Sequence, residues 1–389
     1  MLYYKFRSAT ELSFKELLYS ELRFSSSAEC NDPFDSKVFT EFPKDIHRWS
    51  EVVTKAWAHI DYPALVSLFS TQIALYNHLS FDHFNSTDFA CEVIDELNLN
   101  IPERTRLQLA ERLCIYVSNF RPRKSYFSSF ALESDAALMW SHYADRHQGF
   151  CLIFRALNNR LYQDPARRKN VIRIRNGHLP DSTLHVADSF EFGLVKYVDQ
   201  VIPHNAFNYF PSPSIQLNEE QRLAALNDMQ RNYFEKHVSW SYEKEARLSL
   251  LGASPILSNT AAELAADSRL FNYDPRQLVG IIFGANCSPS TRDRLTDICL
   301  SRFQLAHLSN FDGTLFDFAF FEAKFAPHSR KLTIQPKFML THEDCYQLKA
   351  PHISDSFSNW LDGRGITRAG NTSTLVFLEP GKSQNISWS

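Results

Sequence analysis

A long stretch with the periodicity of helices, from about residue 46 to 118, constrains the fold more than any other feature of the sequence. It lies between two short segments that have the pattern of strands, residues 2–7 and 125–130. In the first of these, side chains alternate between two faces, as they do in a half-buried strand. We therefore predict an α+β protein with a twisted, mixed or antiparallel core sheet and an α-helical insertion at about 46–118.

The most informative later segment is the run SYEKEARLSLL, residues 241–251. Its alternation is typical of a strand, in which Glu243, Glu245 and Arg247 share one face. A helix is predicted directly before it, from about residue 217 to 239, because apolar residues there recur at helical spacing. Two acids and a base are therefore expected together on one strand face.

The organisation of the chain follows from the same patterns. Ser8 and Glu11 form a capping-box pattern, which predicts a helix directly after the first strand. No internal repeat is evident. We predict one α+β domain over residues 1–310, with the helical insertion inside it, and a C-terminal extension at 311–389 whose fold the pattern does not specify.

Composition excludes several classes of protein. The 389 residues are 44% hydrophobic, which is enough to fill a sizeable core. The chain holds 41 basic and 44 acidic residues, so no overall field favours nucleic acid or an anionic membrane. Its seven cysteines are scattered and never form a C-x-x-C pair. With no secretory signal at the start and no long apolar run, a cytoplasmic protein without a membrane partner is expected.

Missing motifs narrow the chemistry further. The sequence holds no G-x-G-x-x-G, no G-x-x-x-x-G-K-[ST], no G-x-S-x-G and no H-E-x-x-H. His147 lies five residues after His142, which is not the spacing of a helical metal pair, and no metal is expected there. Since only 11 glycines are present, a phosphate-bearing ligand has to be held by side chains and ordinary backbone amides.

Five short blocks of the sequence resemble those of a known family and follow in the same order. They are YKFRS near the start, CNDPFD at 30–35, SSF at 128–130, LMWSHYADRHQGF at 138–150 and WSYEKEARL at 240–248. Together they resemble the bacterial family catalogued as domain of unknown function 2971. The resemblance spans about residues 2–290 and is interrupted by the helical insertion. The family itself implies no activity.

A more distant resemblance concerns mechanism. Arg7 on a first strand, Ser128 and Ser129 on a later one, and Glu243-x-Glu245 on a third resemble the R-S-E pattern of ADP-ribosyltransferases. By that resemblance Arg7 pairs with the diphosphate of NAD, and Ser129 or Ser128 orients the catalytic carboxylate. Glu245 then bonds a hydroxyl of the nicotinamide ribose, and Glu243 activates the acceptor.

Residue chemistry also suits the cleavage of NAD. Cleavage of the N-glycosidic bond of NAD builds positive charge on the ribose, which a fixed carboxylate stabilises. A guanidinium suits a diphosphate because it donates two hydrogen bonds at once. The aromatic side chains of His142 and Tyr143 are predicted to stack on nicotinamide or adenine, whereas Trp140 is expected to pack in the core.

The expectation is thus an NAD-consuming ADP-ribosyltransferase-like enzyme, transferring to water or to a protein or nucleic acid, in the manner of a toxin or phage-defence effector. It requires the side chains of Arg7 and Glu245 to meet on one side of the sheet. Two alternatives stay open. A metal-dependent nuclease would use Asp32 and Asp35 with the glutamates, and a noncatalytic sensor or interaction module would use the same residues as structural hydrogen bonds.

Overall fold

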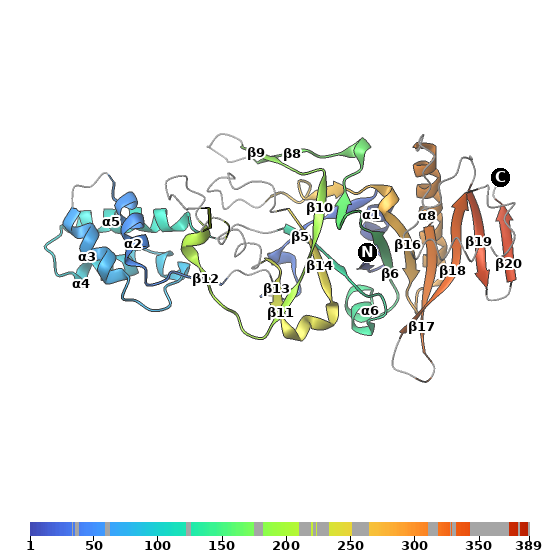
Figure 1. Cartoon of the computed structure of the whole chain (residues 1–389), viewed down its shortest axis with the longest axis horizontal. Helices are drawn as coiled ribbons and strands as arrows, with labels where there is room; N and C mark the ends of the chain where they lie inside the picture. Colours follow the sequence, from blue (N-terminus) through green and yellow to red (C-terminus); the bar gives the residue numbers. More distant parts are fainter. Residues whose placement is uncertain are drawn as a thin grey trace.

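The fold is that of a computed structural model. It describes residues 1–32, 34–35, 39–58, 63–121, 126–174, 182–209, 219–220, 223, 233–250, 264–309, 318–326, 328, 332–342, 373–379 and 382–387. Figure 1 shows a body of helices at one end, a large sheet in the middle and the last strands at the other end.

A 12-stranded sheet organises the larger body, in the order β20-β19-β18-β17-β16-β6-β1-β5-β14-β10-β7, with β3 also paired to β5. Neighbouring strands run antiparallel except β16 and β17, which are parallel. This confirms the predicted α+β class and its mixed, mostly antiparallel sheet. The strands are β1 Leu2–Arg7, β3 Ser25–Ser26, β5 Tyr126–Ala131, β6 Phe150–Arg155, β7 Arg160–Tyr162, β10 Ser189–Leu194, β14 Glu245–Ser249, β16 Leu278–Phe283, β17 Phe318–Phe325, β18 Leu332–His342, β19 Ser373–Glu379 and β20 Lys382–Ser387.

Smaller strand pairs surround this sheet. Two of them are antiparallel: β2 Glu21–Arg23 with β15 Leu270–Asn272, and β8 Val171–Ile174 with β9 Ser182–His185. Two are parallel: β4 Thr40–Glu41 with β12 His204–Asn205, and β11 Lys196–Val198 with β13 Glu235–His237. Short 3-10 helices lie at Ser27–Glu29, Phe81–Phe84, Pro165–Arg167, Ala206–Tyr209, Val238–Glu243 and Pro275–Gln277.

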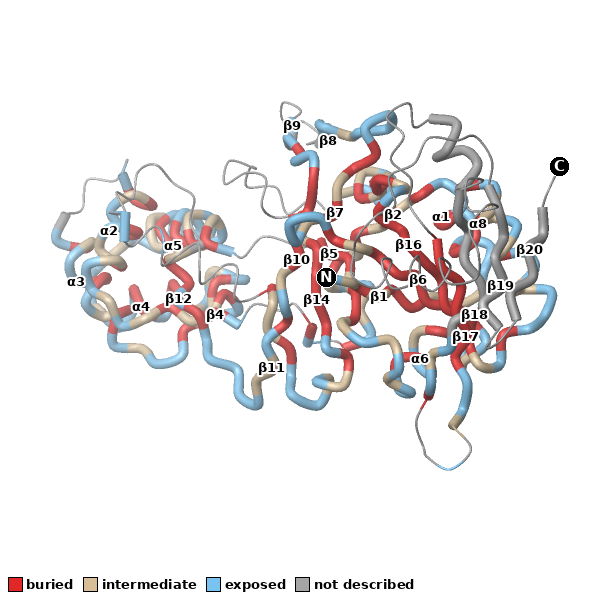
Figure 2. The backbone as a smooth tube through the Cα atoms, turned by 45° about the vertical axis from the view of Figure 1, so that its right-hand side comes forward, coloured by how far each residue is buried: buried red, intermediate tan, exposed pale blue. Residues whose placement is uncertain are grey.

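The two faces of the sheet carry separate apolar cores, and the register between strands determines which core each side chain joins. Tyr4 of β1 lies opposite Ala131 of β5, which in turn lies opposite Glu245 of β14. Directly paired residues point to the same face. Glu245 therefore shares a face with Tyr4, whereas Arg7 points to the other face with Tyr3. Figure 2 shows the buried residues concentrated in these central strands.

Helices cover both faces. Helix α1 (Glu11–Leu18) lies beside α8 (Pro289–Ser309), and Phe14 and Leu17 of α1 pack into the core on the Arg7 side. Helix α6 (Ala137–Tyr143) covers the Glu245 side. The capping prediction at Ser8 was wrong by two residues, because the side chain of Thr10 accepts the hydrogen bond from the Ser13 amide and caps α1.

The helical insertion is confirmed, and its described residues include the helices α2 Ile46–Ala56, α3 Pro63–Ile73, α4 Asp88–Glu96 and α5 Glu103–Ser118. They pack around their own apolar core, which Ala206 and Phe207 complete from a distant part of the chain. Trp57 is buried there and its indole donates a 2.9 Å hydrogen bond to the Leu109 carbonyl. In Figure 1 this body lies apart from the large sheet.

The helix predicted at about 217–239 falls mostly outside the described residues, and its last turn was wrong. Glu235–His237 forms strand β13, which pairs with β11 (Lys196–Val198). Among the residues that the structure describes, no helix is long and apolar enough to cross a membrane. The division into one domain and a C-terminal extension stays a prediction.

Candidate functional site

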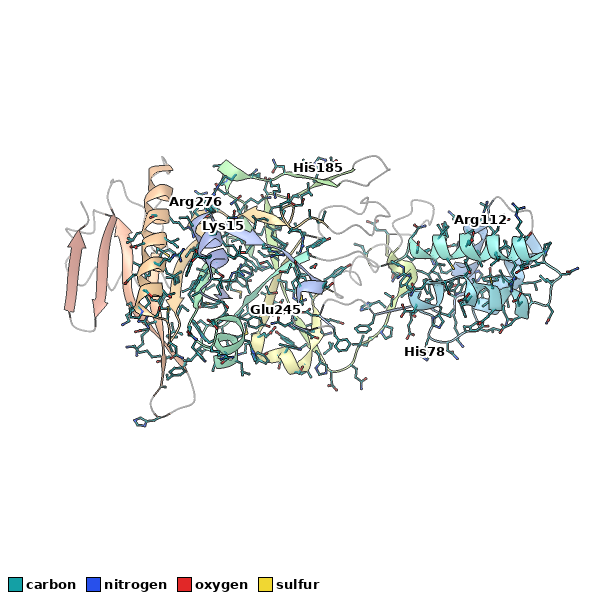
Figure 3. All side chains as sticks on the ribbon, turned by 180° about the vertical axis from the view of Figure 1, so that it is seen from behind. Lys15, His78, Arg112, His185, Glu245 and Arg276 are labelled. Carbon is teal, nitrogen blue, oxygen red and sulfur yellow. The ribbon has the colours of Figure 1, made fainter. Side chains whose placement is uncertain are left out.

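The serines and glutamates of the predicted site lie on adjacent strands. Ser129 of β5 pairs in register with Arg247 of β14, and Ser128 pairs with Leu248. Ser129 therefore shares a face with Glu245, whose carboxylate it hydrogen-bonds, and Ser128 points to the opposite face. Figure 3 shows Glu245 inside the sheet-bearing body, far from the labelled residues His78 and Arg112 of the helical insertion.

Arg247 organises the centre of this face. Its Nε lies 2.7 Å from Oε1 of Glu245, and its Nη2 lies 2.9 Å from Oε2, so the guanidinium grips the carboxylate with two hydrogen bonds. The same Nη2 lies 2.8 Å from Oδ1 of Asp35. Nη1 of Arg247 donates a 3.0 Å hydrogen bond to the Tyr233 carbonyl. The side chain is fully buried, and its planar fork suits this many fixed acceptors.

Lys236 lies at the junction of three carboxylates. Its Nζ is 2.6 Å from Oε2 of Glu243, 3.3 Å from Oδ2 of Asp35 and 3.4 Å from Oε2 of Glu245. Lys236 was not predicted as a site residue, because residues 217–239 were expected to form a helix, whereas Lys236 lies in strand β13. We refer to Asp35, Lys236, Glu243, Glu245 and Arg247 as the charge cluster.

Glu243 does not lie on strand β14, contrary to prediction. It ends the 3-10 helix Val238–Glu243, and Lys244, with φ of 42°, turns the chain into the strand. This turn brings Glu243 back towards Glu245 at Lys236. On its other side the Tyr143 hydroxyl donates a 2.5 Å hydrogen bond to Oε1 of Glu243.

The pKa values of the two glutamates are shifted in opposite directions. Burial opposes ionisation of Glu245, but the charge and hydrogen bonds of Arg247 outweigh it and lower the pKa of Glu245 to about 2. Burial raises the pKa of Glu243, and the nearby charge of Lys236 offsets this only in part. Burial and the bond to Glu243 together raise the pKa of Tyr143. The cluster therefore holds one firmly ionised carboxylate beside one that retains its proton more easily.

Arg7 does not meet Glu245, which corrects the arrangement expected from the ADP-ribosyltransferase resemblance. It lies in register with Phe150, on the opposite face of the sheet, and its guanidinium pairs with Glu16 at 2.5 Å. Beside it on that face, Lys5 donates a 2.8 Å hydrogen bond to the Ser128 hydroxyl. Arg7 and Ser128 thus belong to a second polar group under α1 and do not contact the charge cluster.

Aromatic side chains border the cluster where it approaches the surface. The ring of Tyr242 lies 6.1 Å from that of His142 and 6.0 Å from that of Trp240. Lys236 Nζ lies 4.8 Å from the centre of the Trp240 ring. His142 is exposed and the others are half-buried. We refer to His142, Tyr143, Trp240 and Tyr242 as the aromatic rim.

Trp140, two residues before His142 of this rim, packs in the core as predicted. It is fully buried, meets Phe6 edge-on and donates its indole hydrogen to the Ser134 carbonyl at 2.7 Å. It therefore fixes α6 to the sheet and leaves the rim to its neighbours.

The carboxylates are not arranged as a metal site. The Asp32 side chain accepts a 2.9 Å hydrogen bond from the Phe34 amide, which makes an Asx turn. Asp35 does join the glutamates, but the cations Lys236 and Arg247 lie between them. Over the described part of the chain, no three His, Cys, Asp or Glu side chains are grouped so as to hold a metal ion.

Comparison with known families supports one of the two resemblances. Residues 139–248 match the family described as Protein of unknown function (DUF2971). The DUF2971 match includes Tyr143, Lys236 and the segment Glu243–Arg247. Asp35 and Ser129 precede the matched residues and lie outside it. It carries no activity with it. The search of curated proteins and the search of solved structures each found no match.

Proposed function

We propose that the charge cluster cleaves the N-glycosidic bond of NAD or a closely similar nucleotide, passing the ADP-ribosyl group to water or to a macromolecular acceptor. The observation that carries this proposal is the pair Glu243 and Glu245, two adjoining carboxylates with opposite pKa shifts. Two carboxylates held at different acidities are the usual means of breaking a glycosidic bond near neutral pH. The ADP-ribosyltransferase resemblance, which requires Arg7 beside Glu245, does not support the proposal, because Arg7 lies on the other face of the sheet; the support comes from the two carboxylates.

The roles follow from the two acidities. As the bond from C1′ to the nicotinamide nitrogen breaks, nicotinamide leaves with the electron pair and positive charge develops on the ribose. Glu245, held ionised by Arg247, stabilises that charge. The acceptor oxygen then bonds to C1′ and gives its proton to Glu243, whose raised pKa suits a group that takes up a proton.

The aromatic rim supports a nucleotide as the substrate. Tyr143 contacts Glu243 directly, Tyr242 precedes Glu243 in the chain, and Trp240 lies three residues before it. A flat ring stacked on these side chains would hold its ribose close to the carboxylates. This keeps the predicted binding role of His142 and Tyr143 as part of the proposal.

The test is release of nicotinamide from NAD by the purified chain, with cell lysate added as a source of acceptors. We expect release by the wild type and loss of at least about a hundredfold with Glu245→Gln and with Glu243→Gln. Glu133→Gln is the matched control, because Glu133 is an exposed glutamate whose partner is Lys244. Absence of release by the wild type, or undiminished release by both variants, contradicts the proposal.

A noncatalytic sensor or interaction module is the second candidate. The observation that favours it is the complete pairing of Glu245 and Arg247, both almost fully buried, which is also how a structural ion pair is built. In that case Glu245→Gln lowers the free energy of unfolding and the wild type releases no nicotinamide. The same assay with a stability measurement separates the two.

A further inference from the structure

The charge cluster is buried, and one of its members comes from a part of the chain far from the others in sequence. The side chains of its five members are at most 5% exposed. Four members come from residues 236–247, and the fifth, Asp35, comes from the segment 30–35 between a 3-10 helix and β4. Phe34, next to Asp35, is 64% exposed. Asp35 is thus the one member carried by a connecting segment.

Asp35 occupies a position suited to an oxyanion. Its Oδ1 and Oδ2 lie 2.8 and 2.9 Å from Nη2 of Arg247, and Oδ2 lies 3.3 Å from Nζ of Lys236. A guanidinium and an ammonium converging on one small anion form a donor set that proteins use for phosphate. Glu245 and Glu243 hold these two cations in place from the other side.

Asp35 sets the net charge of the cluster. Three carboxylates face two cations, so with all groups ionised the cluster has one negative charge in excess. Removing Asp35 leaves two carboxylates and two cations. Arg7 lies on the other face, whereas the guanidinium of Arg247 contacts the carboxylate of Glu245 directly.

We propose that Asp35 closes an anion site formed by Arg247 and Lys236, and that the diphosphate of the nucleotide substrate displaces it. The choice of a nucleotide rests on the proposed function, whereas the anion site rests on the geometry alone. Binding then moves Asp35 outward and opens the carboxylate pair to the ribose. The empty enzyme is in this sense held shut by its own carboxylate.

The first experiment measures binding of inorganic pyrophosphate to the full chain by titration calorimetry. With Asp35→Asn the competing anion is gone while an acceptor for Arg247 remains, so we expect binding at least about tenfold tighter than in the wild type. Asp32→Asn is the matched control, since its carboxylate bonds the Phe34 amide. Lys236→Met added to Asp35→Asn should remove the gain. Equal affinities of the Asp35 and Asp32 variants would overturn the proposal.

The second experiment needs no variant. Cys30 is half-buried and its thiol donates a hydrogen bond to the Ser26 carbonyl, while burial and the charge of Asp35 raise its pKa to about 12. Displacement of Asp35 should increase the alkylation rate of Cys30 several-fold in pyrophosphate compared with chloride of equal ionic strength. Cys114, in the helical insertion, is the internal reference. An unchanged ratio of the two rates contradicts displacement.

The experiments can reject NAD cleavage and the anion site independently of each other. Tighter pyrophosphate binding without nicotinamide release would keep the anion site and reject NAD cleavage. Nicotinamide release with no effect at Asp35 would keep the activity and reject the displacement.

Discussion

Arg247 and Glu245 stand two residues apart on strand β14 and bind each other through two hydrogen bonds, of 2.7 and 2.9 Å, on the same face of the sheet. Such a bond fixes the plane of the carboxylate as well as its charge. Because both side chains are buried, Glu245 depends on Arg247 to remain ionised, and Arg247 depends on Glu245 to offset the loss of its water contacts. The consequences can be measured as stability, acidity and activity.

Removing Arg247 should be strongly destabilising. Arg247→Met leaves the carboxylates of Asp35 and Glu245 buried with Lys236 as the remaining cation of the cluster, which typically costs about 3–5 kcal/mol. Urea unfolding followed by circular dichroism measures it. Arg48→Met, which breaks an exposed pair with Glu51, should cost no more than about 1 kcal/mol. Similar losses for both variants would show that the cluster contributes little.

The two glutamates should affect acid stability in opposite directions. The pKa of Glu245 is lowered to about 2, so its ionisation contributes stability above its usual pKa of 4.5, and this is lost as the pH falls towards 2. The pKa of Glu243 is raised, so its contribution is present at low pH and is lost as the pH rises. Glu245→Gln should therefore destabilise the protein at pH 7 and flatten the loss below about pH 4.5, whereas Glu243→Gln should cost much less at pH 7. Unfolding free energies compared across this pH range check the difference, and equal costs at pH 7 would contradict it.

Tyr143 should tune the acidity of Glu243. Its hydrogen bond lowers the pKa of Glu243 against the effect of burial. Under the proposed function, Tyr143→Phe should shift the acidic limb of the pH profile of nicotinamide release to higher pH. The control is Tyr76→Phe, which removes a similar 2.7 Å tyrosine to glutamate bond, to Glu96, in the helical insertion. An unshifted limb would mean that Glu243 does not control it.

Lys5 gives a prediction independent of function. Burial lowers its pKa from 10.5 to about 7. Between those values the unfolded chain binds a proton that the folded protein does not, so the free energy of unfolding should rise with pH across this range. Below about pH 7 both forms are protonated and the penalty stays constant. Urea unfolding of wild type and Lys5→Met from pH 6 to 10 checks this, and an equal rise in both would assign it to another group.

The strands were predictable from local pattern, but the site was predictable only in part. Glu245 and Arg247 share a face because strand periodicity requires it. The error about Arg7 has a different origin, because a side chain of β1 faces Glu245 or turns away according to the register between strands. A shift of one residue reverses the answer, and nothing local in either strand specifies it.

The other members of the cluster depend on distant contacts. Asp35 reaches Arg247 across 212 residues of chain, a contact that no local pattern around Asp35 specifies. Lys236 was hidden because its segment has apolar residues at helical spacing, yet pairing with β11 and three carboxylates draws it into a strand. A lysine that neutralises carboxylates has no sequence pattern of its own.

The apolar core of the helical insertion includes Ala206 and Phe207, and strand β12 beside them pairs with β4 at the start of the insertion. The unit that evolution or a protein engineer could exchange is consequently not one contiguous cassette. A transplant of residues 39–121 alone would leave an uncovered patch around Phe42 and Trp49, where the Phe207 ring packs. Relatives that lack the insertion should also lack the 3-10 helix Ala206–Tyr209, which carries Phe207. The two segments should therefore be gained and lost together.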